Sequence, residues 1–177
     1  SKLGFHYLDS GALYRIVGYA SKAANVDYSQ HQALADLSIS LKIQFHQDKI
    51  LLDQVDITEA IRTEEMGLRA SSVGAIPAVR EALLELQKSF LKPPGLVADG
   101  RDMGSVVFPQ AQLKVFLTAE AKIRAERRYK QLIAKGISAN IDILTKDLME
   151  RDANDTQRKV APLIQCKDAH LLDTSDL

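Results

Sequence analysis

Two carboxylates and a guanidinium stand within four residues in Asp99-Gly100-Arg101-Asp102, directly after the apolar segment 95–98. The apolar lead-in predicts a short buried strand. Because charges are costly to bury in a core, we expect the polar cluster in a crevice at the carboxyl end of that strand. Carboxylates beside an arginine indicate a binding site with two ends, one that binds magnesium and phosphate and one that binds a polar ring. A solvated loop with ordinary surface charges is the alternative that these residues alone leave open.

A second polar turn, Asp9-Ser10-Gly11, follows the apolar residues of segment 5–8 and precedes a helix predicted over residues 12–24. We expect Ser10 to cap this helix. Backbone N–H groups and the helix dipole favour an anion at such a start, and Arg15 lies one turn further along to clamp it. A plain capped helix start is the alternative, but it leaves Tyr14 and Arg15 unexplained.

Charged residues also recur at helical spacing in two later segments, where each set shares one helix face. The first set is Arg124, Arg127 and Arg128; the second, if its helix continues, is Arg151, Asp155 and Arg158. Neighbouring guanidinium groups repel one another unless anions or carboxylates offset them, and a solvated charged face is the more common explanation. The number of separate arginine clusters favours a polyphosphate site, because phosphoryl transfer needs positive charge around the transferred group.

Strand and helix patterns alternate along the chain. Short apolar runs at 5–10, 96–99, 113–118 and 170–174 are separated by helical periodicity at 12–24, 64–73, 78–91, 121–134 and 141–151. This alternation predicts an α/β fold, with a parallel sheet flanked by helices and functional residues at the carboxyl ends of its strands. Segments 41–45 and 50–53 flank a polar turn, and 55–58 could add a third strand. They predict a small antiparallel insert.

Composition excludes several classes of protein. The chain has 177 residues, 46% hydrophobic and 26% charged, as expected of one soluble domain with a core. A formal net charge of zero and an aromatic content of 6% disfavour binding to nucleic acid or to an anionic membrane. The sequence shows neither a long apolar span nor a secretory signal, so we expect a cytoplasmic protein. Cys166 is the single cysteine and the four histidines are scattered, which disfavours a disulfide framework or a His/Cys metal site.

Ordered blocks over nearly the whole chain resemble the bacterial cytidylate kinases, which are P-loop nucleoside monophosphate kinases. The blocks are segments 8–15, 61–64, 79–84, 98–109 and 150–163. The resemblance implies a P-loop kinase fold with a small antiparallel insert and a helical lid. It also implies transfer of a phosphoryl group from ATP to CMP or dCMP, with Mg²⁺.

The resemblance further implies roles for particular residues. The cytosine base would be read by Ser71, Arg80 and Asp102. The phosphate and ribose of CMP would be held by Ser10, Arg15, Arg101, Arg151 and Asp155. The lid would contribute Arg124, Arg127, Arg128 and Arg158, and Mg²⁺ would be held through water by Asp9 and Asp99. The expected partners are the nucleotides ATP, CMP and dCMP, without nucleic acid or membrane, and the expected state is a monomer.

We expect one kinase domain over residues 1–177, truncated at both ends. Its core would comprise residues 1–35, 75–120 and 160–177, with a monophosphate-binding insert at about 36–74 and a lid at about 121–159. The family's first strand, its Gly-rich phosphate loop and its final helix are missing from this sequence. No residue can therefore be assigned to the ATP phosphate loop, and we expect a truncated or partly observed version of a longer protein.

Two alternatives stay open. The first is a kinase for another monophosphate, such as UMP or a deoxynucleotide. The second is a non-catalytic nucleotide-binding module, which applies if the phosphate loop is truly absent. A nucleic-acid-binding protein is disfavoured by the zero net charge and the few aromatic residues.

Overall fold

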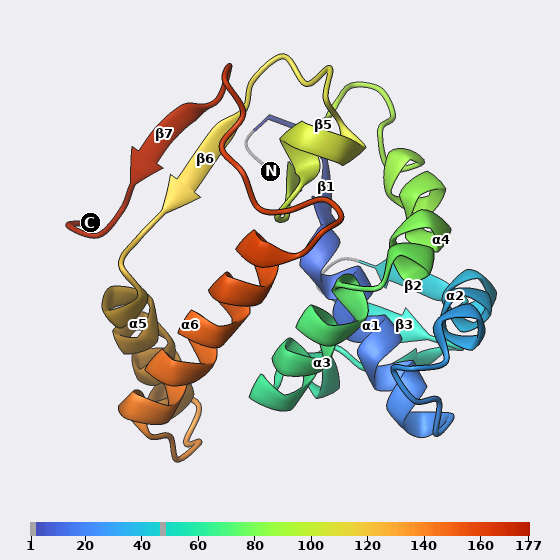
Figure 1. The fold of residues 1–177 in the computed structure, drawn as a ribbon, viewed down its shortest axis with the longest axis horizontal. Coiled ribbons are helices and arrows are strands. Elements are labelled where there is room, and N and C mark those ends of the chain that lie inside the picture. The colour runs from blue at the N-terminus through green and yellow to red at the C-terminus, as the bar shows by residue number, and fades with distance from the viewer. Residues whose placement is uncertain (1–2, 47–48) are drawn as a thin grey trace. The chain divides into compact units, whose positions relative to one another are not determined.

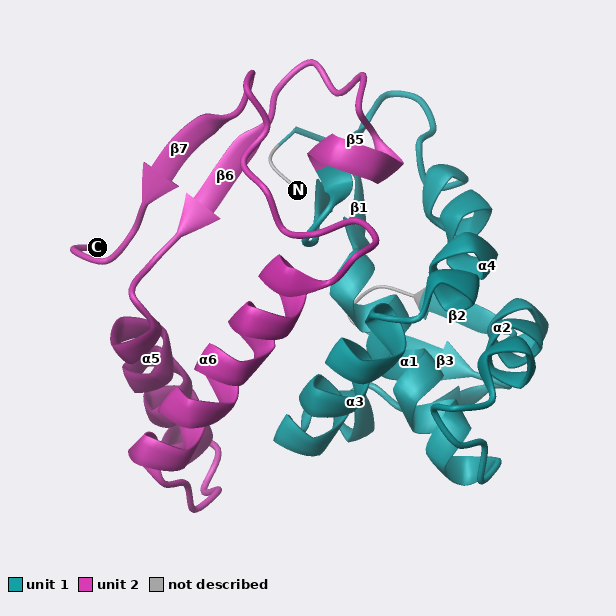
Figure 2. Cartoon of the chain, viewed as in Figure 1, with its two compact units in different colours: residues 1–103 teal, residues 104–177 magenta. Residues whose placement is uncertain are grey.

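The chain folds into helices, two parallel strand pairs and one small antiparallel sheet in the computed structural model, which describes residues 3–46 and 49–177 (Figure 1). The chain divides into two compact units, Ser1–Met103 and Gly104–Leu177 (Figure 2). Each unit is described by itself below.

The first unit contains the two strands that precede the polar turns. Strands β1 (His6–Asp9) and β5 (Leu96–Asp99) pair in parallel, with His6 opposite Leu96 and Asp9 opposite Asp99. Both strands were predicted from their apolar patterns. Because carboxyl ends of parallel strands lie at one edge of a sheet, this register brings two carboxylates from distant parts of the chain next to each other.

The first unit also contains helices α1 to α4. Helix α1 (Ser10–Ala23) packs against α3 (Glu64–Gly74), and α2 (His31–Ser40) packs against α4 (Pro77–Lys88). The fully buried Leu13, Ile16 and Val17 form part of one apolar face of α1, as helical spacing requires. The 3₁₀ turn η1 (Ala60–Arg62) leads into α3. Helix α2 was not predicted, because its buried face is short and includes Ser38.

The predicted cap of α1 is wrong. Asp9, not Ser10, is the N-cap, and its Oδ1 atom accepts a hydrogen bond of 2.9 Å from the backbone N–H of Ala12. Aspartate caps helices as well as serine does, and here it is the residue that still has extended backbone geometry. Ser10 is therefore the first helical residue, and its hydroxyl bonds to a distant part of the chain.

The antiparallel insert is confirmed. Strands β2 (Ile43–His46), β3 (Lys49–Leu52) and β4 (Val55–Asp56) form a three-stranded antiparallel sheet, with β3 in the middle. Ile50 on β3 is buried.

The second unit combines a parallel strand pair with a helical hairpin. Strands β6 (Val115–Thr118) and β7 (His170–Asp173) pair in parallel, and α5 (Ala121–Ala134) packs against α6 (Ile141–Gln157). Ala125, Leu132 and Leu144 form the buried contact between these helices. A single turn of π-helix, η2 (Met103–Val107), spans the division between the units. Helix α6 extends six residues beyond the predicted end, so Arg151 and Asp155 do lie on one helix.

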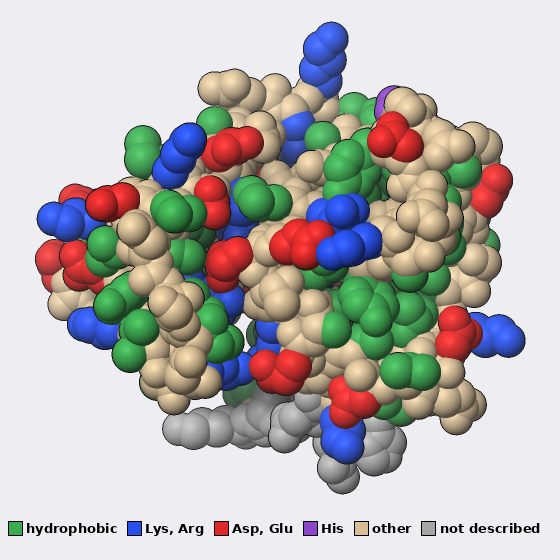
Figure 3. All heavy atoms as spheres, turned by 90° about the horizontal axis from the view of Figure 1, so that it is seen from below, with side chains coloured by type: hydrophobic (Ala, Val, Ile, Leu, Met, Phe, Trp, Pro, Cys, Tyr) green, Lys and Arg blue, Asp and Glu red, His purple; other side chains and the backbone are tan. Residues whose placement is uncertain are grey.

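These elements confirm the predicted α/β class, with parallel strands flanked by helices and a small antiparallel sheet. The boundaries predicted for core, insert and lid stay predictions. Among the helices described, none is both long and apolar enough to cross a membrane. Figure 3 shows acidic and basic side chains interspersed over one face, as the zero net charge leads one to expect.

Candidate functional site

The carboxyl ends of β1 and β5 carry the acidic part of the candidate site. Asp9 and Asp99 are register partners, and the Tyr7 hydroxyl donates a hydrogen bond of 2.8 Å to Asp99 Oδ1. Loss of hydration on burial raises the pKa of Asp99, and the neighbouring Asp9 carboxylate also raises it. A bound cation would remove this repulsion between the two carboxylates.

The donor set at these strand ends suits a magnesium ion that keeps part of its water shell. Carboxylate oxygens are ligands that Mg²⁺ prefers, and the ion commonly retains several waters. Within residues 3–46 and 49–177, no group of three or more His, Cys, Asp or Glu side chains is arranged to hold a metal ion. Two carboxylates alone would leave most of the coordination sphere of such an ion to water.

The guanidinium of Arg15 is held in place by backbone carbonyls. Its Nη1 donates to Ile61 O at 2.8 Å and to Thr63 O at 3.0 Å. These carbonyls lie at the junction between η1 and α3, 46 and 48 residues away along the chain. The bonds fix the plane of a guanidinium one turn into α1, which is a useful arrangement for binding a phosphate.

Two of the residues predicted to read the base form a buried ion pair. The Arg80 and Asp102 side chains are only 8% and 4% exposed, and Arg80 Nη2 donates to Asp102 Oδ2. Arg80 Nη1 also donates to Gly74 O at 2.9 Å, at the last residue of α3. The guanidinium lies over the ring of the buried Tyr14, 5.4 Å from its centroid. Such partners hold two opposite charges in a fixed orientation at low solvent exposure.

The third predicted base reader, Ser71, lies three residues before Gly74 on α3. Its hydroxyl oxygen is buried and has no hydrogen-bond partner among the described residues. An unsatisfied buried hydroxyl costs about 1–3 kcal/mol, so such groups call for an explanation. A polar ligand atom that bonds to this hydroxyl would remove the cost.

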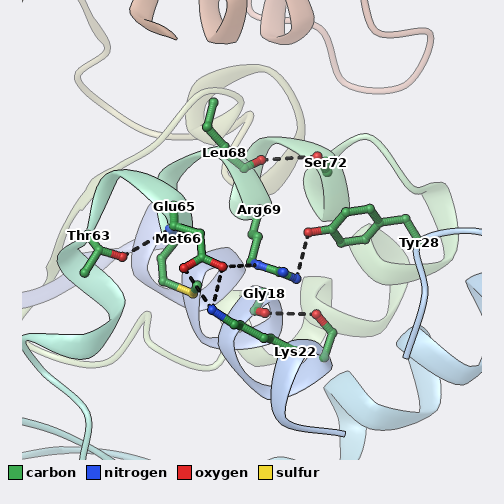
Figure 4. A network of polar contacts seen from close by, with 10 residues as sticks. Gly18, Lys22, Tyr28, Thr63, Glu65, Met66, Leu68, Arg69 and Ser72 are labelled. Atoms are coloured by element: carbon green, nitrogen blue, oxygen red, sulfur yellow. Dashed lines mark hydrogen bonds and ion pairs between the residues drawn. The ribbon is translucent and has the colours of Figure 1, made fainter. Parts of the chain in front are cut away.

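Helix α3 is held against α1 by a close approach and a polar network (Figure 4). A Cβ atom at Gly18 would lie 2.9 Å from Arg69 Cβ, so α1 needs a glycine where α3 crosses it. Glu65 accepts from Lys22 Nζ at 2.7 Å and from Arg69 Nε at 3.1 Å, and Arg69 Nη1 donates to the Tyr28 hydroxyl at 3.1 Å. The network links α3, which carries Ser71, to α1 and to Tyr28.

Arg101 has an exposed side chain between Asp99 and Asp102. Its positive charge lowers the pKa of Asp99, against the larger effect of burial. The first unit thus brings together Arg80 and Asp102 by direct contact, and Asp9 and Asp99 by strand register. It places Arg101 in the loop that joins the two groups.

In the second unit, two of the predicted lid arginines bind residues outside their own helix. Arg124 forms a bidentate pair with Asp152, including an Nη1–Oδ1 bond of 3.1 Å, and also donates from Nε to Ala119 O. Arg127 donates to the hydroxyl and carbonyl oxygens of Thr174 and to Leu177 O. Arginines that share one helix face therefore bind different segments of the unit, which offsets their mutual repulsion.

The remaining charged residues of this unit lie on or beside α6. Arg158, the C-cap residue, pairs with Asp155 at 3.5 Å and donates from Nε to Ala161 O at 2.7 Å. Asp155 is buried, and Arg151 is partly buried one turn before it. Arg128 Nη1 lies 3.5 Å from Gln131 Oε1 on its own helix, a marginal bond.

Comparison with known proteins identifies the family. The family model for cytidylate kinase matches residues 1–177. The chain belongs to the cytidylate kinase family. It is 58% identical over 176 residues to the cytidylate kinase of Polynucleobacter asymbioticus, an alignment that covers 99% of this chain and 80% of that protein.

Other relatives support the same assignment. The chain is 55% identical to the cytidylate kinase of Cupriavidus necator over 99% of this chain and 79% of that protein. It is 52% identical to that of Bordetella pertussis, again over 99% of this chain and 79% of that protein. Membership of the cytidylate kinase family confirms the predicted resemblance, and with it the prediction of an enzyme, a nucleotide-binding kinase and hence a transferase.

Two residues that contact the candidate site were not predicted, although the sequence carried a signal for each. Tyr7 lies two residues before Asp9 on β1, so strand periodicity places the two side chains on one face. Gln87 lies seven residues after Arg80 and four after Leu83, which places it on the buried face of α4. A polar residue at an apolar position of a helix indicates a buried hydrogen bond. The partner could not be named without the tertiary structure.

Proposed function

We propose that this cytidylate kinase family member transfers a phosphoryl group from ATP to CMP or dCMP and yields CDP or dCDP. The observation that carries the proposal is the buried Arg80–Asp102 pair, together with the unsatisfied hydroxyl of Ser71. A buried hydroxyl such as that of Ser71 suits a ligand with its own donors and acceptors, because an apolar ligand would leave it unpaired. The Arg80–Asp102 pair holds two further polar groups in a fixed orientation.

Cytosine matches this set of groups. It offers an amino donor at N4 and acceptors at N3 and O2. A carboxylate such as Asp102 can accept from N4, while the Arg80 guanidinium and the Ser71 hydroxyl can donate to the ring acceptors. Uracil carries an acceptor in place of the N4 amino group, so the same carboxylate would repel it.

We assign the phosphate and ribose of the acceptor to polar and charged residues at the start of α1, after β5 and on α6. These residues are Ser10, Arg15, Arg101, Arg151 and Asp155. The anchored guanidinium of Arg15 supports its part in this assignment, because its orientation is already fixed before a phosphate binds. We assign the lid arginines, Arg124, Arg127, Arg128 and Arg158, to stabilise charge on the transferred phosphoryl group.

In the proposed reaction, an oxygen of the acceptor phosphate attacks the γ-phosphorus of ATP in line with the leaving group. The new O–P bond forms as the bond to the β–γ bridging oxygen breaks, and ADP leaves with that electron pair. The arginines neutralise charge on the phosphoryl oxygens, and no protein nucleophile is required. Asp9 and Asp99 would hold Mg²⁺ through water, and the ion would supply positive charge to the ATP phosphates.

Steady-state assays of ADP release by the full-length protein test the proposal, with CMP, dCMP, UMP and AMP compared at saturating ATP and Mg²⁺. We expect kcat/KM to be highest for CMP and dCMP. Preference for UMP would overturn the roles given to Asp102 and Arg80. Binding of CMP without turnover would instead support a nucleotide-binding module.

A further inference from the structure

A buried hydrogen bond joins the start of α1 to the middle of the first unit. The Ser10 hydroxyl donates to Gln87 Oε1 at 2.7 Å, across 77 residues of sequence. Ser10 is 2% exposed and Gln87 is 1% exposed. A buried bond between two neutral side chains is strong locally, because neither partner can turn to water instead.

Three segments of the site meet at this bond. A Cβ atom at Gly100 would lie only 3.0 Å from Ser10 Cβ, so the end of β5 lies directly against Ser10. Gln87 extends from α4, where its Nε2 also donates to Leu83 O at 3.3 Å. The same helix carries Arg80 two turns earlier.

The bond therefore connects the two halves of the proposed acceptor site. On one side is the turn at the start of α1, with its Asp9 cap and the Arg15 guanidinium. On the other side is α4 with the buried Arg80–Asp102 pair. The distance between a bound base and its phosphate is fixed by the nucleotide, so the protein must hold these two parts at a matching distance.

We propose that Gln87 is a positioning residue, which acts through Ser10 to hold the phosphate-binding turn at the correct distance from the base-reading residues. The inference rests on the proposed function, because it concerns how the same acceptor site is held. It narrows the role given to Ser10 above: the single hydroxyl proton is donated to an amide oxygen, so Ser10 would face a phosphate with its backbone N–H and not with its hydroxyl.

A double-mutant cycle in the full-length protein tests this proposal, with Ser10→Ala, Gln87→Met and the double variant. We expect each single variant to raise the KM for CMP about 3- to 10-fold, with little change in the KM for ATP. Because both changes break one bond, the double variant should resemble either single variant rather than show the product of the two effects. Gln87→Glu keeps an acceptor for Ser10 and should restore part of the loss relative to Gln87→Met.

Ser21→Ala is the matched control. Ser21 is fully buried on the same helix, but its hydroxyl donates only to Gly18 O, one turn earlier. This variant should alter thermal stability without changing the KM for CMP. If Ser10→Ala raised KM equally in the Gln87→Met background, Ser10 would contact the phosphate directly and the proposal would be overturned. An unchanged KM in both single variants would overturn it as well.

The wild-type protein separates this inference from the proposed function. Failure of the wild type to phosphorylate CMP would count against the function. The cycle would then be measured with the monophosphate that is turned over, or by calorimetric binding of CMP. Should Gln87→Met fail to fold by circular dichroism, Gln87→Asn replaces it, because its shorter side chain withdraws the amide from Ser10.

Discussion

Tyr7 donates its hydroxyl proton to Asp99 across neighbouring parallel strands, although more than half of the Tyr7 side chain is exposed to solvent. Burial of the hydroxyl and its bond to the carboxylate both raise the pKa of Tyr7 above its usual value. The folded protein therefore holds this proton more tightly than the unfolded chain does. The stabilisation is fully present below about pH 10, the ordinary tyrosine pKa, and is lost as the pH rises above it.

The Tyr7→Phe variant should thus show a weaker dependence of stability on alkaline pH. We expect the free energy of unfolding of the wild type to fall more steeply than that of the variant between about pH 9.5 and 11. Urea denaturation at several pH values measures this difference, and the other four tyrosines are common to both proteins. Parallel profiles for the two proteins would show that the hydrogen bond contributes nothing to the pH dependence.

Ser71→Ala should separate stability from function. Because the buried hydroxyl has no partner among the described residues, its removal should leave the free energy of unfolding unchanged or raise it by up to about 1 kcal/mol. The KM for CMP should rise about 10-fold, because the hydroxyl bonds to the base in the proposed complex. Thermal unfolding and steady-state kinetics check the two effects. The neighbouring Ser72→Ala is the control, since the Ser72 hydroxyl is exposed and donates to Leu68 O.

Removal of one partner of the Arg80–Asp102 pair should reduce both stability and base recognition. Asp102→Ala leaves a buried guanidinium without its carboxylate, which typically costs about 3–5 kcal/mol. We expect kcat/KM for CMP to fall at least 10-fold, with little effect on the KM for ATP. Arg101→Ala provides the contrast, because loss of a phosphate contact should reduce turnover with every acceptor base.

The double variant Arg80→Met/Asp102→Leu tells a stability effect from a recognition effect. Replacement of both charges by apolar groups should recover most of the lost stability. It should not recover the use of CMP, because an apolar pair cannot bond to the cytosine edge. Recovery of CMP kinetics together with stability would mean that the pair is structural only.

Gly18→Ala should disturb the contact between α1 and α3. The added Cβ would lie 2.9 Å from Arg69 Cβ, so the helices must move apart, at a cost of about 1–3 kcal/mol. Because α3 carries Ser71, we also expect a higher KM for CMP. Glu65→Gln is the matched control, since it weakens the half-exposed ion pairs on the same two helices without adding an atom at their crossing, and surface pairs contribute little. A Gly18→Ala protein as stable as the wild type would show that this crossing relaxes without cost.

Local sequence patterns were sufficient to predict most of the helices and strands and the types of residue in the site. Apolar runs that end in Asp9 and Asp99 predicted two strands, and helical spacing predicted α1, α3, α4, α5 and α6. These patterns are local, because the period of a strand or helix is set by backbone geometry over a few residues. Ordered motifs along the chain also identified the cytidylate kinase family.

The partners of the charged and polar side chains were decided only by the tertiary structure. Nothing in the local sequence shows that Ser10 bonds to Gln87, that Arg15 binds the carbonyls near η1, or that Tyr7 donates to Asp99. Local sequence also left both Asp9 and Ser10 as possible helix caps. In the folded chain the Asp9 carboxylate accepts from Ala12 N–H, while the Ser10 hydroxyl bonds to the distant Gln87. Hydrogen bonds and ion pairs join residues that are adjacent in space but dozens of positions apart, so the fold must form before the pairing is determined.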